Sequence, residues 1–189
     1  MKMQGAEAEV EILDSRVLKT RKSKKYRHPR LDKNIIRERT ENEVRNMERA
    51  ILHGVNVPEA EKKDANTIQI QKIKGEAWKV KEDTNLMERV GHNVAKMHDC
   101  NLIHGDLTTS NILIQKEEAF LIDFGLSEVS ERVEDKAVDI HLLKQVLGSS
   151  HPEISGEAWE KFLEGYREYD YSDEVLERLE EVEQRGRYK

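Results

Sequence analysis

Two periods of apolar and polar positions organise the first half of the chain. Residues 5–12 alternate small or apolar side chains with glutamates, which predicts a half-buried β-strand. A turn is predicted at Asp14 and Ser15, and residues 16–20 are predicted to form the second strand of a hairpin. Residues 32–52 place apolar side chains on or near one side at helical spacing, which predicts a long α-helix. The first half is therefore expected to combine short strands with one helix.

Helical patterns dominate the remainder of the chain. Strands are predicted over residues 67–70, 111–114 and 120–122, and helices over 86–97, 140–147, 157–166 and 172–182. In the first of these helices, apolar residues recur every three or four positions, as expected for an amphipathic helix. Trp159 and Phe162 mark the predicted inward face of the helix that contains them.

Composition narrows the class of protein. The chain has 189 residues, of which 37% are hydrophobic and 37% charged, so it can bury a core as one domain or as a compact two-lobed unit. The single cysteine, Cys100, excludes an intramolecular disulfide and fits a reducing compartment. No apolar run approaches the ~18 residues that span a bilayer, and no N-terminal signal pattern is present. We therefore expect a cytoplasmic protein with no membrane contact.

The candidate chemistry lies within residues 102–125. Asp106 stands in a short polar loop, Asn111 follows five positions later, and Asp123 follows the second of two strand-like runs. Phosphoryl transfer requires a group that orients an acceptor hydroxyl and groups that hold cations against phosphate oxygens. Asp106 can accept the hydroxyl proton, whereas Asn111 and Asp123 offer the oxygen ligands that Mg²⁺ prefers. A hairpin that connects Asp106 and Asn111 to Asp123 would place these side chains on the same side of a site.

The order of these motifs resembles that of the protein-kinase superfamily. His-x-Asp-x-x-x-x-Asn is followed by two strands and then by Asp-Phe-Gly. Gly105 stands where most kinases have arginine, and the loop is similar to that of the small atypical kinases of the PRPK type, the kinase subunit of the KEOPS complex. The resemblance implies an α+β, minimal bilobal protein-kinase-like fold with a small mixed N-lobe and a helical C-lobe. It implies a single kinase-like domain over residues 1–189, with the N-lobe at 1–70, the hinge at 71–75, the C-lobe at 76–189 and a basic tail at 185–189.

The same resemblance implies an ATP site between the lobes. Gln-Gly-Ala-Glu-Ala resembles the family's short phosphate loop, although it has one glycine where most kinases have several. Lys19 falls where the family has the lysine that contacts the α and β phosphates, and Glu43 would pair with it. Asp139, the last residue of Glu-Asp-Lys-Ala-Val-Asp, would brace the backbone of the catalytic loop. The implied ATP-binding residues are Gly5, Ala6, Glu7, Ala8, Lys19, Gln71 and Ile73, and the implied catalytic residues are Asp106, Lys19 and Glu43.

Basic residues are concentrated in one segment of an otherwise acidic chain. The net charge is -6, yet residues 16–30 hold eight lysines or arginines and no acid. A solvated loop is the commonest structure for such a run, and a contact to nucleotide or RNA phosphates is the alternative. The segment and the tail resemble basic regions of the PRPK-type family. The implied RNA or partner contacts are Lys22, Lys24, Lys25, Arg27, Arg185 and Arg187.

The activity implied by the resemblance depends on ATP and Mg²⁺. It is phosphorylation of serine or threonine, including autophosphorylation, or ATP hydrolysis. The family further implies a place in KEOPS beside the threonylcarbamoyl-transferring subunit, in a complex that modifies tRNA. Two alternatives stay open: a small-molecule kinase of the aminoglycoside or choline type, which also uses His-Gly-Asp, and an adaptor that binds ATP without turnover. No long activation segment follows Gly125, so few surfaces remain for selecting a protein substrate.

Overall fold

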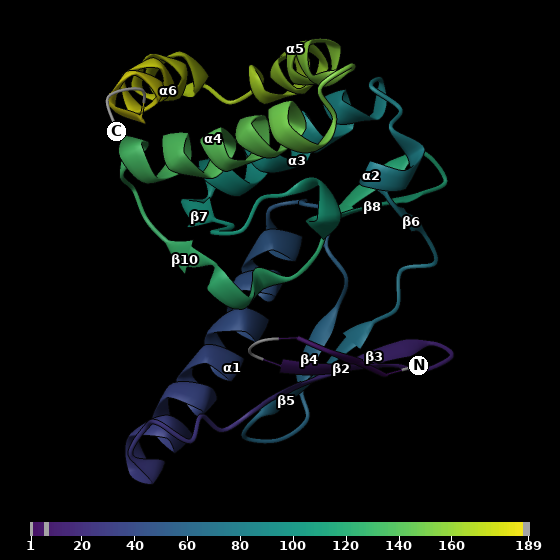
Figure 1. Ribbon diagram of the computed structural model, residues 1–189, viewed down its shortest axis with the longest axis vertical. Coiled ribbons are helices and arrows are strands. Elements are labelled where there is room, and N and C mark those ends of the chain that lie inside the picture. The colour runs from purple at the N-terminus through teal and green to yellow at the C-terminus, as the bar shows by residue number, and fades with distance from the viewer. Residues whose placement is uncertain (1, 6–7, 187–189) are drawn as a thin grey trace.

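The first part of the chain forms a five-stranded antiparallel sheet in the order β1-β2-β3-β5-β4 (Figure 1). The computed structural model describes residues 2–5 and 8–186. The strands are β1 (Lys2–Gln4), β2 (Ala8–Ile12), β3 (Arg16–Arg21), β4 (Ala60–Lys62) and β5 (Thr67–Gln71). On the central strand β3, Lys19 lies opposite Val10 of β2 and Ile68 of β5. The pairing on both sides fixes the backbone of Lys19.

Helix α1 (Pro29–Leu52) connects β3 to β4. It begins three residues before its predicted start, because Pro29 fits the first turn, where backbone N–H groups have no partner inside the helix. Met47 and Ala50 bury its inner face. Figure 1 shows the N-terminal end of α1 projecting away from the molecule, whereas its C-terminal end reaches the helical part.

The second part of the chain is mainly helical. Its helices are α2 (Trp78–Lys81), α3 (Leu86–Asp99), α4 (Val133–Ser150), α5 (Ser155–Tyr166) and α6 (Ser172–Gly186), with 3-10 turns η1 (Thr109–Asn111) and η2 (Phe124–Leu126). Two small antiparallel sheets join β10 (Glu128–Val129) to β7 (Leu102–Ile103), and β6 (Glu76–Ala77) to β8 (Ile112–Gln115) and β9 (Glu118–Leu121). Gly91 on α3 and Gly165 on α5 bring these helices into backbone contact, because a Cβ on either would overlap a carbonyl oxygen of the other helix.

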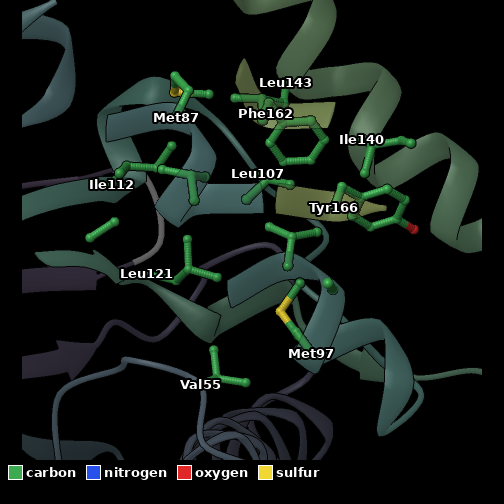
Figure 2. Packing of buried hydrophobic residues seen from close by; sticks show 14 of the residues in the cluster. Val55, Met87, Met97, Leu107, Ile112, Leu121, Ile140, Leu143, Phe162 and Tyr166 are labelled. Carbon is green, nitrogen blue, oxygen red and sulfur yellow. The ribbon is translucent and has the colours of Figure 1, made fainter. Parts of the chain in front are cut away.

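An apolar core fills the helical part and reaches the loop between β7 and β8 (Figure 2). Leu107 of that loop is fully buried and belongs to the same apolar cluster as Phe162, and both are labelled in Figure 2. Because Leu107 directly follows Asp106, its packing fixes the backbone that carries Asp106. Phe124, which directly follows Asp123, is also buried. Each candidate carboxylate is therefore anchored by an apolar neighbour in the chain.

The longer predicted elements are confirmed and the shortest are missed. Helices predicted over 86–97, 140–147, 157–166 and 172–182 correspond to α3, α4, α5 and α6, and strands predicted over 16–20, 67–70, 111–114 and 120–122 to β3, β5, β8 and β9. The strand predicted over 5–12 is confirmed for Ala8–Ile12, which form β2, and is wrong at Gly5, whose N–H donates to the Ala8 carbonyl oxygen (2.9 Å). Strands β1, β4, β6, β7 and β10 are too short to show an alternation. Within residues 2–5 and 8–186, no helix has the length and apolar character needed to cross a membrane.

Candidate active site

Lys19 on β3 and Glu43 on α1 form a buried ion pair. The Lys19 Nζ lies 2.7 Å from the Glu43 Oε1, and the side chains are 11% and 1% exposed. A charged carboxylate this deeply buried requires a partner, because its desolvation is costly. The pair therefore joins the central strand of the sheet to α1.

A second cation, Arg21, completes the pairing of Glu43. The Arg21 Nη2 lies 2.5 Å from the Glu43 Oε2, and the Arg21 side chain is 6% exposed. Side chains two positions apart on a strand point to the same face, so Lys19 and Arg21 reach the carboxylate together. The sequence does not single out Arg21 among the cations of residues 16–30, although its spacing from Lys19 is the available signal.

Asp123 lies on the other side of Lys19. Its Oδ1 is 2.6 Å from the Lys19 Nζ and accepts a hydrogen bond from the Gly125 N–H (3.3 Å). The backbone of Asp123 is left-handed, with φ 64° and ψ 67°, so the chain turns sharply between β9 and η2. Burial alone would raise the pKa of this carboxyl, but the charge and hydrogen bond of Lys19 outweigh burial and hold the pKa below its ordinary value. Asp123 is therefore ionised at neutral pH.

Asn46 ties α1 to the segment that follows Asp-Phe-Gly. Its Nδ2 donates to the carbonyl oxygen of Ser127 (3.0 Å) and to the Ser127 Oγ (2.9 Å). The Ser127 hydroxyl in turn donates to the Phe124 carbonyl oxygen (2.6 Å). Because Asn46 lies one helical turn after Glu43, one face of α1 contacts both the Lys19 side and the Asp123 side of the site.

Asp106 and Asn111 are joined within the loop between β7 and β8. The Asn111 Nδ2 donates to the carbonyl oxygen and to the Oδ2 of Asp106, each at 2.9 Å. Among the described residues, no hydrogen bond reaches the Oδ1 of Asp106 or the Oδ1 of Asn111. One oxygen of each side chain is therefore available to a substrate or a cation.

His104 connects this loop to the strand that carries Asp123. The Asp106 N–H donates to the His104 Nδ1 (3.3 Å), so the ring proton lies on Nε2, which donates to the Ile122 carbonyl oxygen (3.0 Å). The His104 ring also packs on Phe124, with centroids 4.8 Å apart. One imidazole thus links the positions of Asp106 and Asp123.

Asp139 on α4 holds the backbone of the same loop. Its Oδ2 accepts the His104 N–H (2.8 Å) and its Oδ1 accepts the Gly105 N–H (2.9 Å). Gly105 has φ +78°, and a Cβ there would overlap the carbonyl oxygen of Leu126. The arginine that most kinases carry at this position would not fit. Glycine lets the loop pack directly on the residue after Asp-Phe-Gly.

His98 extends this network into the core. Its Nε2 lies 3.3 Å from the Asp139 Oδ2, and its Nδ1 lies 2.8 Å from the Tyr166 hydroxyl. Burial lowers the pKa of His98 and raises that of Tyr166 well above its ordinary value. The ring is therefore neutral, donates from Nε2 to Asp139 and accepts the Tyr166 proton at Nδ1. Burial alone would raise the pKa of Asp139, but its bonds to His98 and to the His104 N–H keep that pKa lowered.

We expect this network to lose stability as the pH falls from 7.5 to 5.5. The pKa of His98 in the folded protein lies below its ordinary 6.5, so below that pH the unfolded chain binds a proton that the folded chain does not. The free energy of unfolding therefore falls with pH in this window. Asp139, whose pKa is also lowered, adds a further loss as the pH falls below its ordinary 3.8.

Urea denaturation at pH 7.5 and 5.5 measures the effect. His98→Gln should be less stable at pH 7.5 but should lose less stability on acidification than the wild type. His28→Gln is the control, because His28 is exposed. Equal acid losses in the wild type and in His98→Gln would contradict the assignment.

A cleft of about 450 Å³ lies between the sheet and the helical part. It combines the apolar residues Val10, Ile12, Val17, Ile70, Leu113 and Ile122 with the polar residues Lys19, Asn111 and Asp123. Gln71 and Ile73 also line it. The Gln71 N–H donates to the Glu59 carbonyl oxygen (2.7 Å), whereas the Ile73 N–H makes no hydrogen bond to any described residue. The predicted contacts of adenine with backbone groups of Gln71 and Ile73 stay a prediction, in which the Gln71 N–H is already bonded within the fold and the Ile73 N–H is available to a ligand.

Comparisons with known proteins decide the family. A family model described as the RIO domain matches residues 8–140. The KEOPS complex subunit Bud32 of Pyrococcus abyssi is 35% identical over 208 residues, which cover 98% of this chain and 94% of the relative. The probable serine/threonine-protein kinase BUD32 homolog of Archaeoglobus fulgidus is 37% identical over 188 residues, which cover 97% and 94%. The chain belongs to the Bud32 family of RIO-domain kinases.

Other relatives of this Bud32-family kinase are much longer. A probable bifunctional tRNA threonylcarbamoyladenosine biosynthesis protein of Methanospirillum hungatei is 43% identical over 185 residues, which cover 97% of this chain. The chain spans about a third, 35%, of the length of that relative. Among solved structures, the Rio2 kinase of Chaetomium thermophilum matches with a TM-score of 0.67 at 15% identity, covering 100% of this chain and 72% of that one. Amicoumacin kinase hAmiN matches at 0.64 and 15%, covering 89% and 72%. At such identities these two structures confirm the kinase-like α+β fold alone.

The polar groups in the cleft of this Bud32-family kinase fit Mg²⁺ and the phosphates of ATP. The Asn111 Oδ1 and the Asp123 Oδ2 belong to residues that line the cleft, and no described residue hydrogen-bonds to either oxygen. No group of three or more His, Cys, Asp or Glu residues in the described ranges could hold a metal by itself. Mg²⁺ commonly takes one or two protein ligands and completes its shell with water and phosphate oxygens. The apolar residues of the cleft suit the adenine ring.

No described residue of the predicted phosphate loop belongs to the lining of the cleft. Gly5 and Ala8 are not among the described residues that line the cleft. Ala6 and Glu7 lie outside the described residues, as does Arg187 of the tail. The roles of these residues therefore stay predictions.

The basic segment of the Bud32-family kinase folds around a buried aspartate. Asp32 is 1% exposed and accepts hydrogen bonds from the Ser23 Oγ (2.6 Å), the Lys24 N–H (3.2 Å) and the Arg27 Nη1 (3.4 Å). The Ser23 hydroxyl, followed by the other two donors, lowers the pKa of Asp32. Arg27 is thus part of the folded loop as well as a predicted phosphate contact.

Two of the other predicted RNA contacts form ion pairs. Lys22 lies 3.4 Å from the Glu9 carboxylate, and Arg185 lies 2.9 Å from the Glu134 carboxylate. Lys25 is exposed. Partly exposed pairs of this kind contribute roughly 1 kcal/mol or less, so a phosphate could replace the carboxylates at small cost.

Proposed function

We propose that this chain is an ATP- and Mg²⁺-dependent serine/threonine kinase and ATPase that acts in the cytoplasm as a subunit of the KEOPS complex, in the threonylcarbamoyl modification of tRNA. The observation that carries the proposal is that Lys19, Asn111 and Asp123 line one cleft, with Asp106 hydrogen-bonded to Asn111. The relatives support the setting, since they include a KEOPS subunit and a probable protein of tRNA threonylcarbamoyladenosine biosynthesis. We expect contacts with other KEOPS subunits, including the threonylcarbamoyl-transferring one, and with tRNA through the complex.

Each site residue has a distinct part in the proposed reaction. Asp106 accepts the proton of the acceptor hydroxyl, or of water, at Oδ1, while Asn111 holds its Oδ2 in place. Lys19 donates to the phosphate oxygens and is kept in the cleft by Glu43. The Asn111 Oδ1 and the Asp123 carboxylate hold the cation. A bound Mg²⁺ supplies neutralisation of the charge on the phosphate oxygens.

Labelled ATP tests this function directly. The purified chain is incubated with γ-labelled ATP and Mg²⁺ in four reactions: without a substrate, with casein, with an aminoglycoside and with tRNA. We expect slow phosphate release and self-labelling without a substrate, weak labelling of casein, and loss of all three when Mg²⁺ is chelated. Label on the aminoglycoside would identify a small-molecule kinase. ATP binding with neither release nor transfer would identify an adaptor.

The basic segment is expected to contribute to tRNA binding. Replacing Lys22, Lys24 and Lys25 with Gln removes three cations but keeps Arg27, which bonds to Asp32. In the complex assembled with the other KEOPS subunits, tRNA affinity should fall, because fewer phosphates are neutralised. The salt dependence should flatten by about one in log–log slope per lost contact.

A matched triple variant controls for net charge. Replacing Lys96, Lys116 and Lys161 with Gln removes the same number of cations from the helical part. Filter binding across a salt series measures both slopes. An unchanged slope in the first variant would mean that the segment is a solvated loop and that the RNA contacts lie on the partners.

A further inference from the structure

The buried carboxylate of Glu43 is shared by two cations that differ in access to the cleft. Its Oε1 lies 2.7 Å from the Lys19 Nζ and its Oε2 lies 2.5 Å from the Arg21 Nη2. Lys19 is among the residues that line the cleft, whereas Arg21 is not among the described lining residues. Arg21 therefore contacts Glu43 without facing a ligand.

The Lys19 ammonium is already shared by two carboxylates before any nucleotide binds. Its Nζ lies 2.6 Å from the Asp123 Oδ1 as well as 2.7 Å from Glu43. If Asp123 holds a cation and Lys19 contacts phosphates, the contact between these two residues opens. The Glu43 side chain is 1% exposed, so water cannot hydrogen-bond to its carboxylate if Lys19 moves towards the phosphates.

We propose that Arg21 is a positioning residue for Lys19; the inference rests on the nucleotide-dependent function proposed above. Arg21 keeps one oxygen of Glu43 paired whether or not Lys19 is bound to phosphate. Only one oxygen of Glu43 then depends on Lys19, so the carboxylate attracts the ammonium less strongly and leaves it closer to the nucleotide. Without Arg21, a buried and singly paired carboxylate competes with the phosphates for the same cation.

Neighbouring residues hold both the backbone and the guanidinium of Arg21 in place. The Arg21 N–H donates to the Asn66 carbonyl oxygen (2.8 Å), and the Asn66 Nδ2 donates to the Arg21 carbonyl oxygen (3.2 Å). Its Nη2 also lies 3.5 Å from the Arg39 carbonyl oxygen. A Cβ on Gly125 would lie 3.0 Å from the Lys19 Nζ and 3.5 Å from the Arg21 Nη2, so both cations lie against the Asp-Phe-Gly turn.

The first test is a double-mutant cycle in the full chain. Arg21→Met should lower kcat/KM for Mg·ATP by roughly 10- to 100-fold, and Arg21→Lys, which keeps the charge but not the planar donor set, should restore part of it. Because Arg21 acts through Glu43, Arg21→Met with Glu43→Gln should be within about 2-fold of Glu43→Gln alone. Arg16→Met, the same change on the same strand at an exposed position, should leave the rate unchanged.

The second test separates positioning from general loss of structure. Calorimetry compares Mg·AMP-PNP, which carries three phosphates, with adenosine, which carries none. Arg21→Met should weaken AMP-PNP binding by roughly the factor seen in kcat/KM, with adenosine affinity unchanged within about 2-fold. If Arg21→Met does not fold, Arg21→Lys carries the same cycle and the same ligand pair.

Three results decide the matter. Equal losses for AMP-PNP and adenosine would show that Arg21 is merely structural, and additive losses in the double variant would show that it does not act through Glu43; either overturns the inference. If the wild type binds AMP-PNP but turns over no ATP, the proposed activity fails, and the binding cycle still decides the role of Arg21.

Discussion

Asp123→Ala is expected to abolish Mg²⁺-dependent ATP turnover. The carboxylate is ionised beside Lys19 and belongs to the cleft lining, so its loss removes a cation ligand. Lys19 keeps its bond to Glu43, so no buried charge is left unpaired. Alanine also loses the local hydrogen bond to the Gly125 N–H that helps aspartate to adopt the left-handed backbone at φ 64°, so some loss of stability is expected. Asp123→Asn is therefore the better-matched variant, because asparagine tolerates left-handed backbone, and it should lose turnover at nearly wild-type stability.

Turnover at saturating Mg²⁺, together with the melting temperature, measures this expectation. Asp170→Ala is the control, since Asp170 is an exposed aspartate in the helical part. Near-normal ATP turnover in both Asp123 variants would exclude Asp123 as the cation ligand.

Asp106→Asn is expected to slow phosphotransfer by about 10²–10⁴-fold, the usual contribution of general-base catalysis. An amide at this position can still accept the hydrogen bond from the Asn111 Nδ2, so the loop should keep its shape. Asp106 is not among the described residues that line the cleft. Affinity for Mg·AMP-PNP should accordingly stay within a few-fold of wild type.

Single-turnover kinetics and calorimetry on the same preparation separate the two effects. Ser110→Ala is a suitable control, because Ser110 lies in the same segment between β7 and β8 as Asp106 and its side chain is exposed. If Asp106→Asn loses binding and rate to the same extent, Asp106 has a structural role and another group accepts the proton.

Local sequence patterns predicted the parts of the site that are close in the chain. Asp106 and Asn111 are five positions apart, and their spacing with the following hairpin indicated that both would lie near Asp123. The contact of Lys19 with Glu43, 24 positions away, came only from the family resemblance. Spacing cannot show which face of α1 packs on the sheet, because that depends on tertiary contacts.

The structure also contains contacts that no local pattern specifies. Asn46 bonds to Ser127 across 81 positions, and the sequence shows it only as one polar residue on a helix. Arg21 is one of several cations in a basic run, and its burial follows from the acid on the neighbouring helix. Very short strands such as β7 and β10 form because their backbones meet, whatever their side-chain alternation.

Through Glu43 and Asn46, helix α1 is hydrogen-bonded to both sides of the site. It has 24 residues, a length of about 36 Å at 1.5 Å per residue, and carries Glu43 and Asn46 one turn apart near its inner end. Its outer end projects from the molecule (Figure 1). A partner that binds the N-terminal end of α1 and tilts the helix would move Glu43 and Asn46 together. Lys19, which is bonded to Glu43, and Ser127, which is bonded to Asn46, would move with them. The chain reaches α4 at Val133, shortly after Gly125, so α1 is the long element through which a contact far from the cleft can reach Lys19 and the Asp-Phe-Gly segment.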